Sequence, residues 1–210
     1  QRTRAKESSQ FGVDYNAALQ SQISTEFLGY FSGKETTEIG EIFRDGVSVD
    51  RIQAGEKGIL VLAKTPFYAE SGGQSGDVGF IQSDDGDVFQ VSDTQRKGEA
   101  ILHLGVVVRG YFKINQCVQA EITHDVREET KRHHSATHLL HAALQQLLGH
   151  QIVQKGSLVT SNRLRFDFSY GQPLTEDEVN RLERWVNEKI FANYPVAIVE
   201  TSKEEAQKMG

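Results

Sequence analysis

The chain has 210 residues, of which 38% are hydrophobic and 25% are charged, an ordinary composition for a globular protein that can bury a core. Its formal net charge of −6 argues against a broad, non-specific nucleic-acid surface but leaves room for a local contact with one end of an RNA. No apolar run approaches the roughly 20 residues that span a bilayer, so we expect no membrane partner. The single cysteine, Cys117, excludes an internal disulfide and suits a cytoplasmic location.

Residues 1–24 are polar and contain a helix-like segment at 14–22, which Asp14 can cap. This segment carries too little apolar surface to form a domain. We therefore expect a short helical lead-in, the tail of a preceding domain. Because the first residue is Gln1 rather than Met, we also expect the sequence to be part of a longer protein.

Residues 25–124 have the texture of β-structure, with short β-rich runs separated by turn signals such as Asp45-Gly46 and Lys97-Gly98. The predicted strands are 39–43, 47–49, 58–63, 88–91 and 118–122. Several short strands at close spacing predict a small antiparallel barrel or sandwich, and we expect a β-barrel.

Residues 125–210 begin with a helical period. One apolar stripe predicts a long helix that ends at Gly149. Its members are Ala136, Leu139, Leu140, Ala143, Leu144, Leu147 and Leu148. A β-hairpin is predicted next, with strands at 155–159 and 163–168.

The remaining elements complete a second layer. Thr175 and Glu178 form a capping-box pattern, which predicts a helix with Val179, Leu182, Trp185, Val186 and Ile190 on one face. A strand at 196–200 and a final helix after Ser202 are expected to follow. Helix, hairpin, helix and strand predict an α/β two-layer core, so the whole fold is expected to be α+β.

The strongest local signal for chemistry is the pair His134 and His138, spaced as H-x-x-x-H near the start of the long helix. With His141 they fall within a sector of about 60° beside the apolar stripe, so we expect half-buried imidazoles. Two histidines at this spacing can each place a nitrogen on one Zn²⁺, although such pairs are more often structural. No Glu follows His134, which argues against a metalloprotease. Cys117 is expected to pack as a small apolar residue in a barrel strand rather than to bind metal.

A glycine-rich loop, 65–79, provides the second signal. Gly72 and Gly73 allow positive φ and the close approach of a ligand or another backbone. The alternative is a glycine-rich turn packed over Phe67 and Tyr68. The loop lacks the Lys and the spacing of a P-loop, which argues against nucleotide binding by that mechanism.

The third signal lies on the predicted hairpin, where Gln154 and Ser157 face Arg165 and Asp167 of the paired strand. Taken alone, these residues are typical of solvent-facing strand positions. No nucleophile-elbow motif surrounds Ser157, which argues against a serine hydrolase.

Together these segments resemble the editing region of the alanyl-tRNA synthetase family over essentially the whole sequence. The loop 65–79, the helix sequence HSATHLLHAAL and the hairpin sequence QKGSLV…LRFDFS occur in that order at the family's spacing. The stretch through residues 11–15 is similar to the end of the family's tRNA-recognition domain. Three motifs in order are far more specific than any one of them.

The resemblance implies a hydrolytic centre that removes serine or glycine wrongly attached to tRNA(Ala). In the family, the counterparts of His134 and His138 share Zn²⁺ with the Cys and His of a later C-x-x-x-H motif. The 210 residues contain no such motif, so we expect an incomplete metal site and no activity from this portion alone. The catalytic and pocket positions implied are Thr65, as the partner of the serine hydroxyl, Thr137, Gln154 and Ser157. Those implied to contact the substrate are Gly72, Gly73, Gln74, Asp77, Arg165 and Asp167.

The expected partner is the acceptor end of tRNA(Ala). ATP and Mg²⁺ are expected only in a catalytic domain outside this sequence, and oligomerisation only in the longer protein. Whether zinc activates water or positions the substrate is left open. The alternatives are a tRNA-binding or structural linker module, a domain like that of threonyl-tRNA synthetase, and a free-standing tRNA deacylase.

Overall fold

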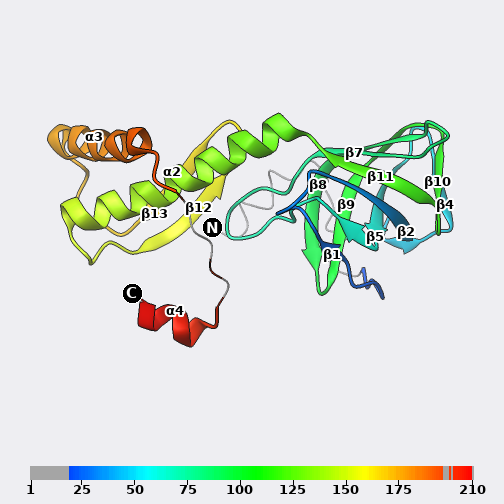
Figure 1. Ribbon diagram of the computed structural model, residues 1–210, viewed down its shortest axis with the longest axis horizontal. Helices are drawn as coiled ribbons and strands as arrows, with labels where there is room; N and C mark the ends of the chain where they lie inside the picture. Colours follow the sequence, from blue (N-terminus) through cyan, green and yellow to red (C-terminus); the bar gives the residue numbers. More distant parts are fainter. Residues whose placement is uncertain (1–18, 196–198, 200, 210) are drawn as a thin grey trace. The chain divides into compact units, whose positions relative to one another are not determined.

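The computed structural model describes residues 19–195, 199 and 201–209, whose helices and strands are labelled in Figure 1. The chain divides into two compact units. The first runs to Ser135 and includes Gly156–Asp167, and the second contains Ala136–Lys155 and the chain from Phe168 onward. The domain boundaries expected at residues 24 and 124 stay predictions.

The first unit contains a closed antiparallel β-barrel, which confirms the predicted fold (Figure 1). Among the described residues, six strands follow one another around it in the order β11-β7-β8-β9-β5-β2, and β11 pairs with β2 to close the ring. Their bounds are β2 Lys34–Arg44, β5 Lys57–Leu62, β7 Gly79–Gln82, β8 Val88–Lys97, β9 Ala100–Arg109 and β11 Cys117–Ile122.

Short strands extend the barrel at its margins. β3 (Val47–Ser48) pairs with the end of β2, and β4 (Arg51–Gln53) pairs with β10 (Tyr111–Lys113). β1 (Glu26–Phe27) runs parallel to β6 (Lys64–Thr65) and sets Phe27 opposite Thr65. This last pairing connects the start of the described chain to the strand that precedes the glycine-rich loop.

Alternating burial along the strands places a hydrophobic core inside the barrel. In β11, for example, Val118, Ala120 and Ile122 are buried, whereas Cys117 and Glu121 are exposed. The prediction that Cys117 packs inside was therefore wrong, because the alternation turns its side chain outward. The large buried members of this core are Ile39, Ile42, Leu60, Leu62, Phe67, Ile81, Phe89 and Phe112.

A second apolar cluster lies on the outer side of the barrel and contains Leu19. Residues 19–25 have no regular secondary structure, so the helix predicted at 14–22 is wrong over 19–22, and residues 1–18 lie outside the described part of the chain. Ser21 holds this segment on the barrel because its hydroxyl donates to Glu41 Oε2 at 2.5 Å.

The long helix α2 (His124–Leu148) forms as predicted. Its first turn is closed by the Arg127 N–H, which donates to the carbonyl of Thr123, and Asp125 lies near the positive end of the helix dipole. The helix ends at Gly149, whose φ of 116° suits a residue without a Cβ. Of the predicted stripe, Ala143 and Leu144 are buried and the remainder is half-buried.

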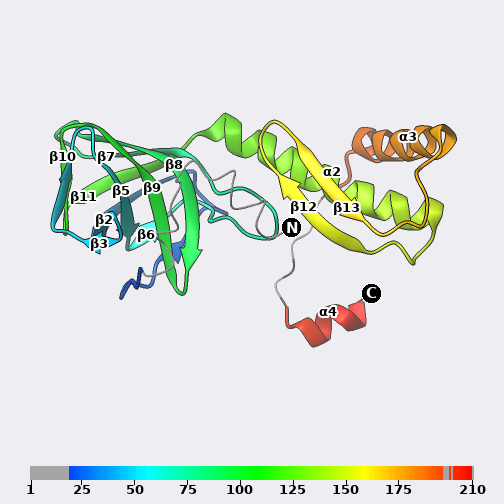
Figure 2. The ribbon, with the colours of Figure 1, turned by 180° about the vertical axis from the view of Figure 1, so that it is seen from behind.

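The hairpin of β12 (Gln154–Val159) and β13 (Leu164–Phe168) also forms as predicted and is seen from behind in Figure 2. Thr160 and Arg163 close its turn through a backbone hydrogen bond of 2.9 Å. Gly156 leaves room for its neighbour, since a Cβ there would lie 2.6 Å from Asp167 Oδ2.

In the second unit, α3 (Glu176–Ala192) begins with the predicted capping box of Thr175 and Glu178. Its predicted apolar face is less buried than expected, since Leu182 is buried but Val179 and Ile190 are about half exposed. The last helix, α4 (Lys203–Met209), follows Ser202, whose hydroxyl accepts from the Glu205 N–H. Most of the strand predicted at 196–200 lies outside the described residues.

Strands and helices together confirm the α+β class. In the part of the chain that the structure describes, no helix is both long and apolar enough to cross a membrane.

Candidate functional site

The glycine loop, defined here as residues 70–77, is built around a tight turn. Ser71 and Gln74 exchange backbone hydrogen bonds of 3.2 and 2.9 Å. The two central residues, Gly72 and Gly73, have φ of 62° and 88°, as in a type I′ turn. The positive φ predicted for these glycines is therefore present, and it fixes the sharp reversal of the chain.

The glycine loop is bound directly to the hairpin. The Val159 N–H donates to the Gly73 carbonyl at 2.7 Å, and the Ser75 N–H donates to the Val159 carbonyl at 2.9 Å. A Cβ at Gly73 would lie 2.5 Å from the carbonyl oxygen of Ser157, whereas one at Gly72 would meet nothing within 4 Å. Gly73 thus allows the backbone of β12 to pass against the loop, beside the half-buried Ser157.

Gln74 connects the loop to the first histidine of the H-x-x-x-H pair. Its side chain is buried, and its Oε1 lies 2.5 Å from Nδ1 of His134. Because a carbonyl oxygen can only accept, Nδ1 carries the hydrogen, and in the neutral ring the lone pair is then on Nε2. Histidines that bind metals are commonly oriented by such a bond from their other nitrogen. From the sequence, Gln74 is expected only among the substrate contacts.

His133, the neighbour of His134, was not singled out by the sequence. Its Nδ1 donates to the Thr160 carbonyl at 2.7 Å, so it binds α2 to the turn of the hairpin. No spacing rule pointed to this contact, since His133 lies outside the sector that holds the other histidines. Glycine loop, hairpin turn and helix are therefore connected by two adjacent imidazoles.

Asp77 lies at the end of the glycine loop and is buried against Arg127 of α2. The Arg127 Nε donates to both Asp77 carboxylate oxygens, at 2.8 and 3.0 Å, and a second guanidinium nitrogen pairs with Oδ2. The same guanidinium donates to the carbonyls of Gly29 and Pro66, at 3.0 and 2.9 Å. Asp77 also accepts from the Tyr68 N–H at 2.6 Å. These contacts make Asp77 an anchor between the barrel and α2, in addition to the substrate contact that was predicted for it.

Thr65 has no exposed surface and bonds to another buried side chain, His103. Nδ1 of His103 lies 3.0 Å from the Leu60 carbonyl and must donate to it, so Nε2 accepts the Thr65 hydroxyl proton at 2.7 Å. Burial lowers the pKa of His103 to about 4 and keeps the ring neutral. The Thr65 oxygen also accepts from the Phe67 N–H. The hydroxyl proton is thus already used, and toward any further group this oxygen can only accept.

The other predicted site residues have varied positions. Thr137 is buried in α2, while His138 and Gln154 are exposed, and these three belong to the second unit. The half-burial expected for His138 was therefore wrong. On β13, Arg165 and Asp167 form a largely exposed ion pair of 3.2 Å.

The donors needed for a metal are present in part. His134 and His138 are one turn apart on α2, and the Nε2 lone pair of His134 is what a zinc ligand requires. Within the described ranges, no group of three or more His, Cys, Asp or Glu side chains is placed to hold a metal ion. His134 and His138 could each supply one nitrogen to a zinc ion, and a tetrahedral site needs two further ligands.

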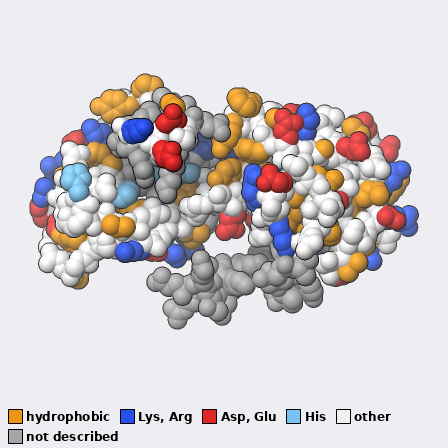
Figure 3. All heavy atoms as spheres, turned by 90° about the horizontal axis from the view of Figure 1, so that it is seen from below, with side chains coloured by type: hydrophobic (Ala, Val, Ile, Leu, Met, Phe, Trp, Pro, Cys, Tyr) orange, Lys and Arg blue, Asp and Glu red, His pale blue; other side chains and the backbone are white. Residues whose placement is uncertain are grey.

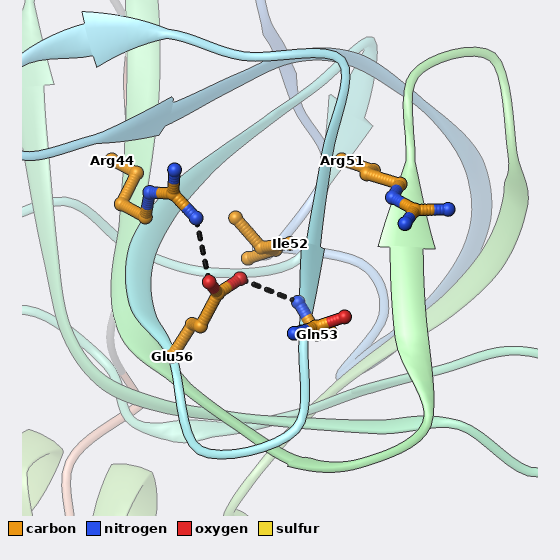
Figure 4. A pocket seen from close by; sticks show the side chains of 5 residues that line it. All are labelled: Arg44, Arg51, Ile52, Gln53 and Glu56. Atoms are coloured by element: carbon orange, nitrogen blue, oxygen red, sulfur yellow. Dashed lines mark hydrogen bonds and ion pairs between the residues drawn. The ribbon is translucent and has the colours of Figure 1, made fainter.

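Pockets on the described residues of the first unit include the following two. One, of about 250 Å³, is formed at the end of β2 and β4 (Figure 4). Arg44 and Glu56 point toward one another across it and pair at 2.6 Å, and Glu56 also accepts from the Gln53 N–H. The Glu56 carboxylate of this pocket is therefore already paired with a cation, Arg44. The other, the aromatic pocket, has a volume of about 290 Å³ and is lined by Phe27, Tyr30, Tyr68, Ala69, Ser71 and Arg96.

The surface charge is mixed. On the face shown in Figure 3, Lys and Arg side chains lie among Asp and Glu side chains and form no extended basic field. This agrees with the net charge of −6 and favours local contacts over a broad electrostatic footprint.

Comparison with known proteins gives the family. The family model described as class II (A) tRNA synthetases matches residues 1–126. Alanine–tRNA ligases from Idiomarina loihiensis, Pseudomonas syringae pv. tomato and Francisella philomiragia align with all 210 residues at 49%, 46% and 46% identity. The chain spans 24% of the length of each of these relatives. Since the family model covers more than half of the chain, the protein belongs to the class II (A) tRNA synthetases.

Proposed function

We propose that this chain is part of an alanine–tRNA ligase and forms most of its editing site, which hydrolyses the ester of Ser-tRNA(Ala) or Gly-tRNA(Ala). The observation that carries the proposal is the bond between Gln74 and His134. A buried amide from the glycine loop presents the first histidine of the pair in the tautomer that a metal ligand needs.

In this proposal His134 and His138 hold Zn²⁺ together with a cysteine and a histidine from elsewhere in the longer protein. Bound zinc would supply a Lewis acid that polarises an ester or lowers the pKa of water. Gln74 keeps the His134 ring fixed, and Gly73 lets β12 approach the loop. Thr137, Gln154 and Ser157 are proposed to line the pocket, and Arg165 and Asp167 to border it.

Thr65 supplies the selectivity in this proposal, and because its side chain has no exposed surface, the substrate must displace the residues that cover it. Its hydroxyl donates its hydrogen bond to His103, so its oxygen can accept a hydrogen bond from the serine hydroxyl. Alanine has no hydroxyl to give, and its ester gains nothing from this acceptor. A synthetic pocket shaped for alanine cannot by itself exclude the smaller glycine or strongly reject one added hydroxyl, so a second site is needed.

The test uses the longer protein, extended through its C-x-x-x-H motif and loaded with zinc. It should hydrolyse Ser-tRNA(Ala) and leave Ala-tRNA(Ala) intact, whereas the 210 residues alone should not. The Gln74→Ala variant should bind zinc about 10- to 100-fold more weakly, the usual effect of removing a bond that orients a ligand. Gln90→Ala, at an exposed position of β8, is the matched control and should bind zinc normally.

A zinc-loaded longer protein that leaves the seryl ester intact refutes the proposal. Zinc-independent, salt-sensitive binding of tRNA by the same protein would then favour the alternative of an RNA-binding or linker module.

A further inference from the structure

The aromatic pocket is not used by the proposed hydrolysis. Three aromatic rings and one guanidinium line it, and Tyr30 is 74% exposed. The Phe27 ring meets both tyrosine rings edge to face, with 5.0 Å between ring centroids for Tyr30 and 6.0 Å for Tyr68. These rings therefore do not stack flat on Phe27, and an exposed aromatic ring of this kind offers a face to a ligand.

The walls of this pocket are held firmly. Tyr68 exchanges hydrogen bonds with Asp77, since its N–H donates to the carboxylate and its carbonyl accepts from the Asp77 N–H. Arg127 binds the carbonyls of Gly29, which precedes Tyr30, and of Pro66, which lies two residues before Tyr68. A preformed wall reduces the entropy that a ligand loses on binding.

The composition of the pocket suits a nucleotide. Exposed tyrosine rings stack on unpaired bases of any sequence, and an arginine binds the phosphate of the same strand. Arg96 is exposed and supplies that charge, and Ser71 adds a hydroxyl. This combination explains how a chain with a net charge of −6 can make a local contact with RNA.

The pocket is also connected to the proposed editing site. Ser71 lines the pocket and exchanges backbone bonds with Gln74, and Gln74 orients His134. A base seated in the pocket therefore lies against the same loop that holds the first metal ligand. The scissile ester of an aminoacyl-tRNA is attached to the last nucleotide of an unpaired 3′ end.

We propose that the aromatic pocket binds a nucleobase of the single-stranded 3′ end of tRNA, by stacking on Tyr30 and Tyr68 and by a phosphate contact to Arg96. This inference rests on the proposed function for the source of the RNA. It assigns the pocket to binding and gives it no part in the chemical step.

Binding can be tested with a fluorescent RNA hairpin that copies the acceptor stem and carries its unpaired 3′ end. The Tyr30→Ala variant should bind it about 5- to 100-fold more weakly, the range expected when one stacked base is lost. Tyr30→Phe keeps the ring and should bind like the wild type. Phe31→Ala removes a neighbouring ring that is 91% exposed but does not line the pocket, and it should change affinity by about twofold at most.

Two further measurements complete the test. Arg96→Gln should reduce the slope of log affinity against log salt by about one, as expected for the loss of one phosphate contact. A blunt hairpin, which lacks the unpaired end, should bind the wild type with low affinity. This affinity should be about equal to that of the full hairpin for Tyr30→Ala. Equal binding of both hairpins by the wild type, or equal losses in Tyr30→Ala and Phe31→Ala, overturns the inference.

Deacylation by the zinc-loaded longer protein separates this inference from the proposed function. If that protein hydrolyses Ser-tRNA(Ala) and Tyr30→Ala leaves its KM unchanged, the pocket assignment fails and the editing function stands. If it hydrolyses nothing while hairpin binding still requires Tyr30 and the unpaired end, the editing function fails and the pocket assignment stands.

Discussion

Protonation of His103 should destabilise the barrel unit in mild acid. The ring has no exposed surface, and both of its nitrogens are used, one donating to Leu60 and the other accepting from Thr65. A second proton on Nε2 would stop this nitrogen from accepting the Thr65 hydroxyl and would place a charge in the core. Burial therefore lowers the pKa of His103 from 6.5 to about 4.

The sign of the effect follows from where the proton binds. Between pH 6.5 and 4 the unfolded chain protonates this histidine and the folded chain does not, so stability is lost as the pH falls through that window. Each pKa unit is worth about 1.4 kcal/mol, and the full lowering is therefore worth about 3 kcal/mol. This contribution is fully present above pH 6.5 and fully lost below about pH 4.

The assay compares urea unfolding of the wild type and of His103→Gln across this range, followed by far-ultraviolet circular dichroism. Carboxyl groups such as Asp93, whose pKa is raised mainly by burial, also titrate on acidification, and the difference between the two proteins removes them. The difference in unfolding free energy between the wild type and His103→Gln should shrink by about 1.4 kcal/mol for each unit that the pH falls. If the variant does not fold, NMR titration of the His103 ring in the wild type gives the pKa directly. A constant difference, or a ring that titrates near 6.5, refutes the reasoning.

Two other substitutions test the contacts of the glycine loop. Gly73→Ala should cost about 2–3 kcal/mol of unfolding free energy, because the new Cβ would meet the Ser157 carbonyl at 2.5 Å. Gly72→Ala, also at positive φ but in open space, should cost only about 1 kcal/mol, and equal losses in thermal unfolding would contradict the close packing. Arg127→Ala should cost about 3–5 kcal/mol, since it leaves the Asp77 carboxylate buried without its cation. Its control, Lys131→Ala, removes an exposed i,i+3 pair with Glu128 and should cost at most about 0.5 kcal/mol in the same urea titration.

The local elements were largely predictable from the sequence. The period of α2, its stop at Gly149 and the capping box at Thr175 are set by residues a few positions apart. The strand β9 was missed because its first six residues are all buried, including His103, and it shows no alternation of apolar and polar residues. On α3 the period was right, but the burial of Val179 and Ile190 was not, since periodicity does not say how much of a face is covered.

The candidate site was predictable only as a set of parts. Gly72, Gly73, His134 and Ser157 were all singled out, yet no pattern indicated that Gln74 would bond to His134 from 60 residues away. The pairs Asp77–Arg127 and Thr65–His103 join residues 50 and 38 apart. Such contacts depend on how the barrel closes, which local spacing does not encode.

The guanidinium of Arg127 has a consequence for the order of folding. It reaches carbonyls and a carboxylate that precede it by 98, 61 and 50 residues. Contacts across such long stretches of chain form late, because the intervening loops must close first. During synthesis from the N-terminus, all three partners leave the ribosome before Arg127 does. All six barrel strands are therefore synthesised before the helix that carries His134, and we expect this helix to attach to the barrel late in folding.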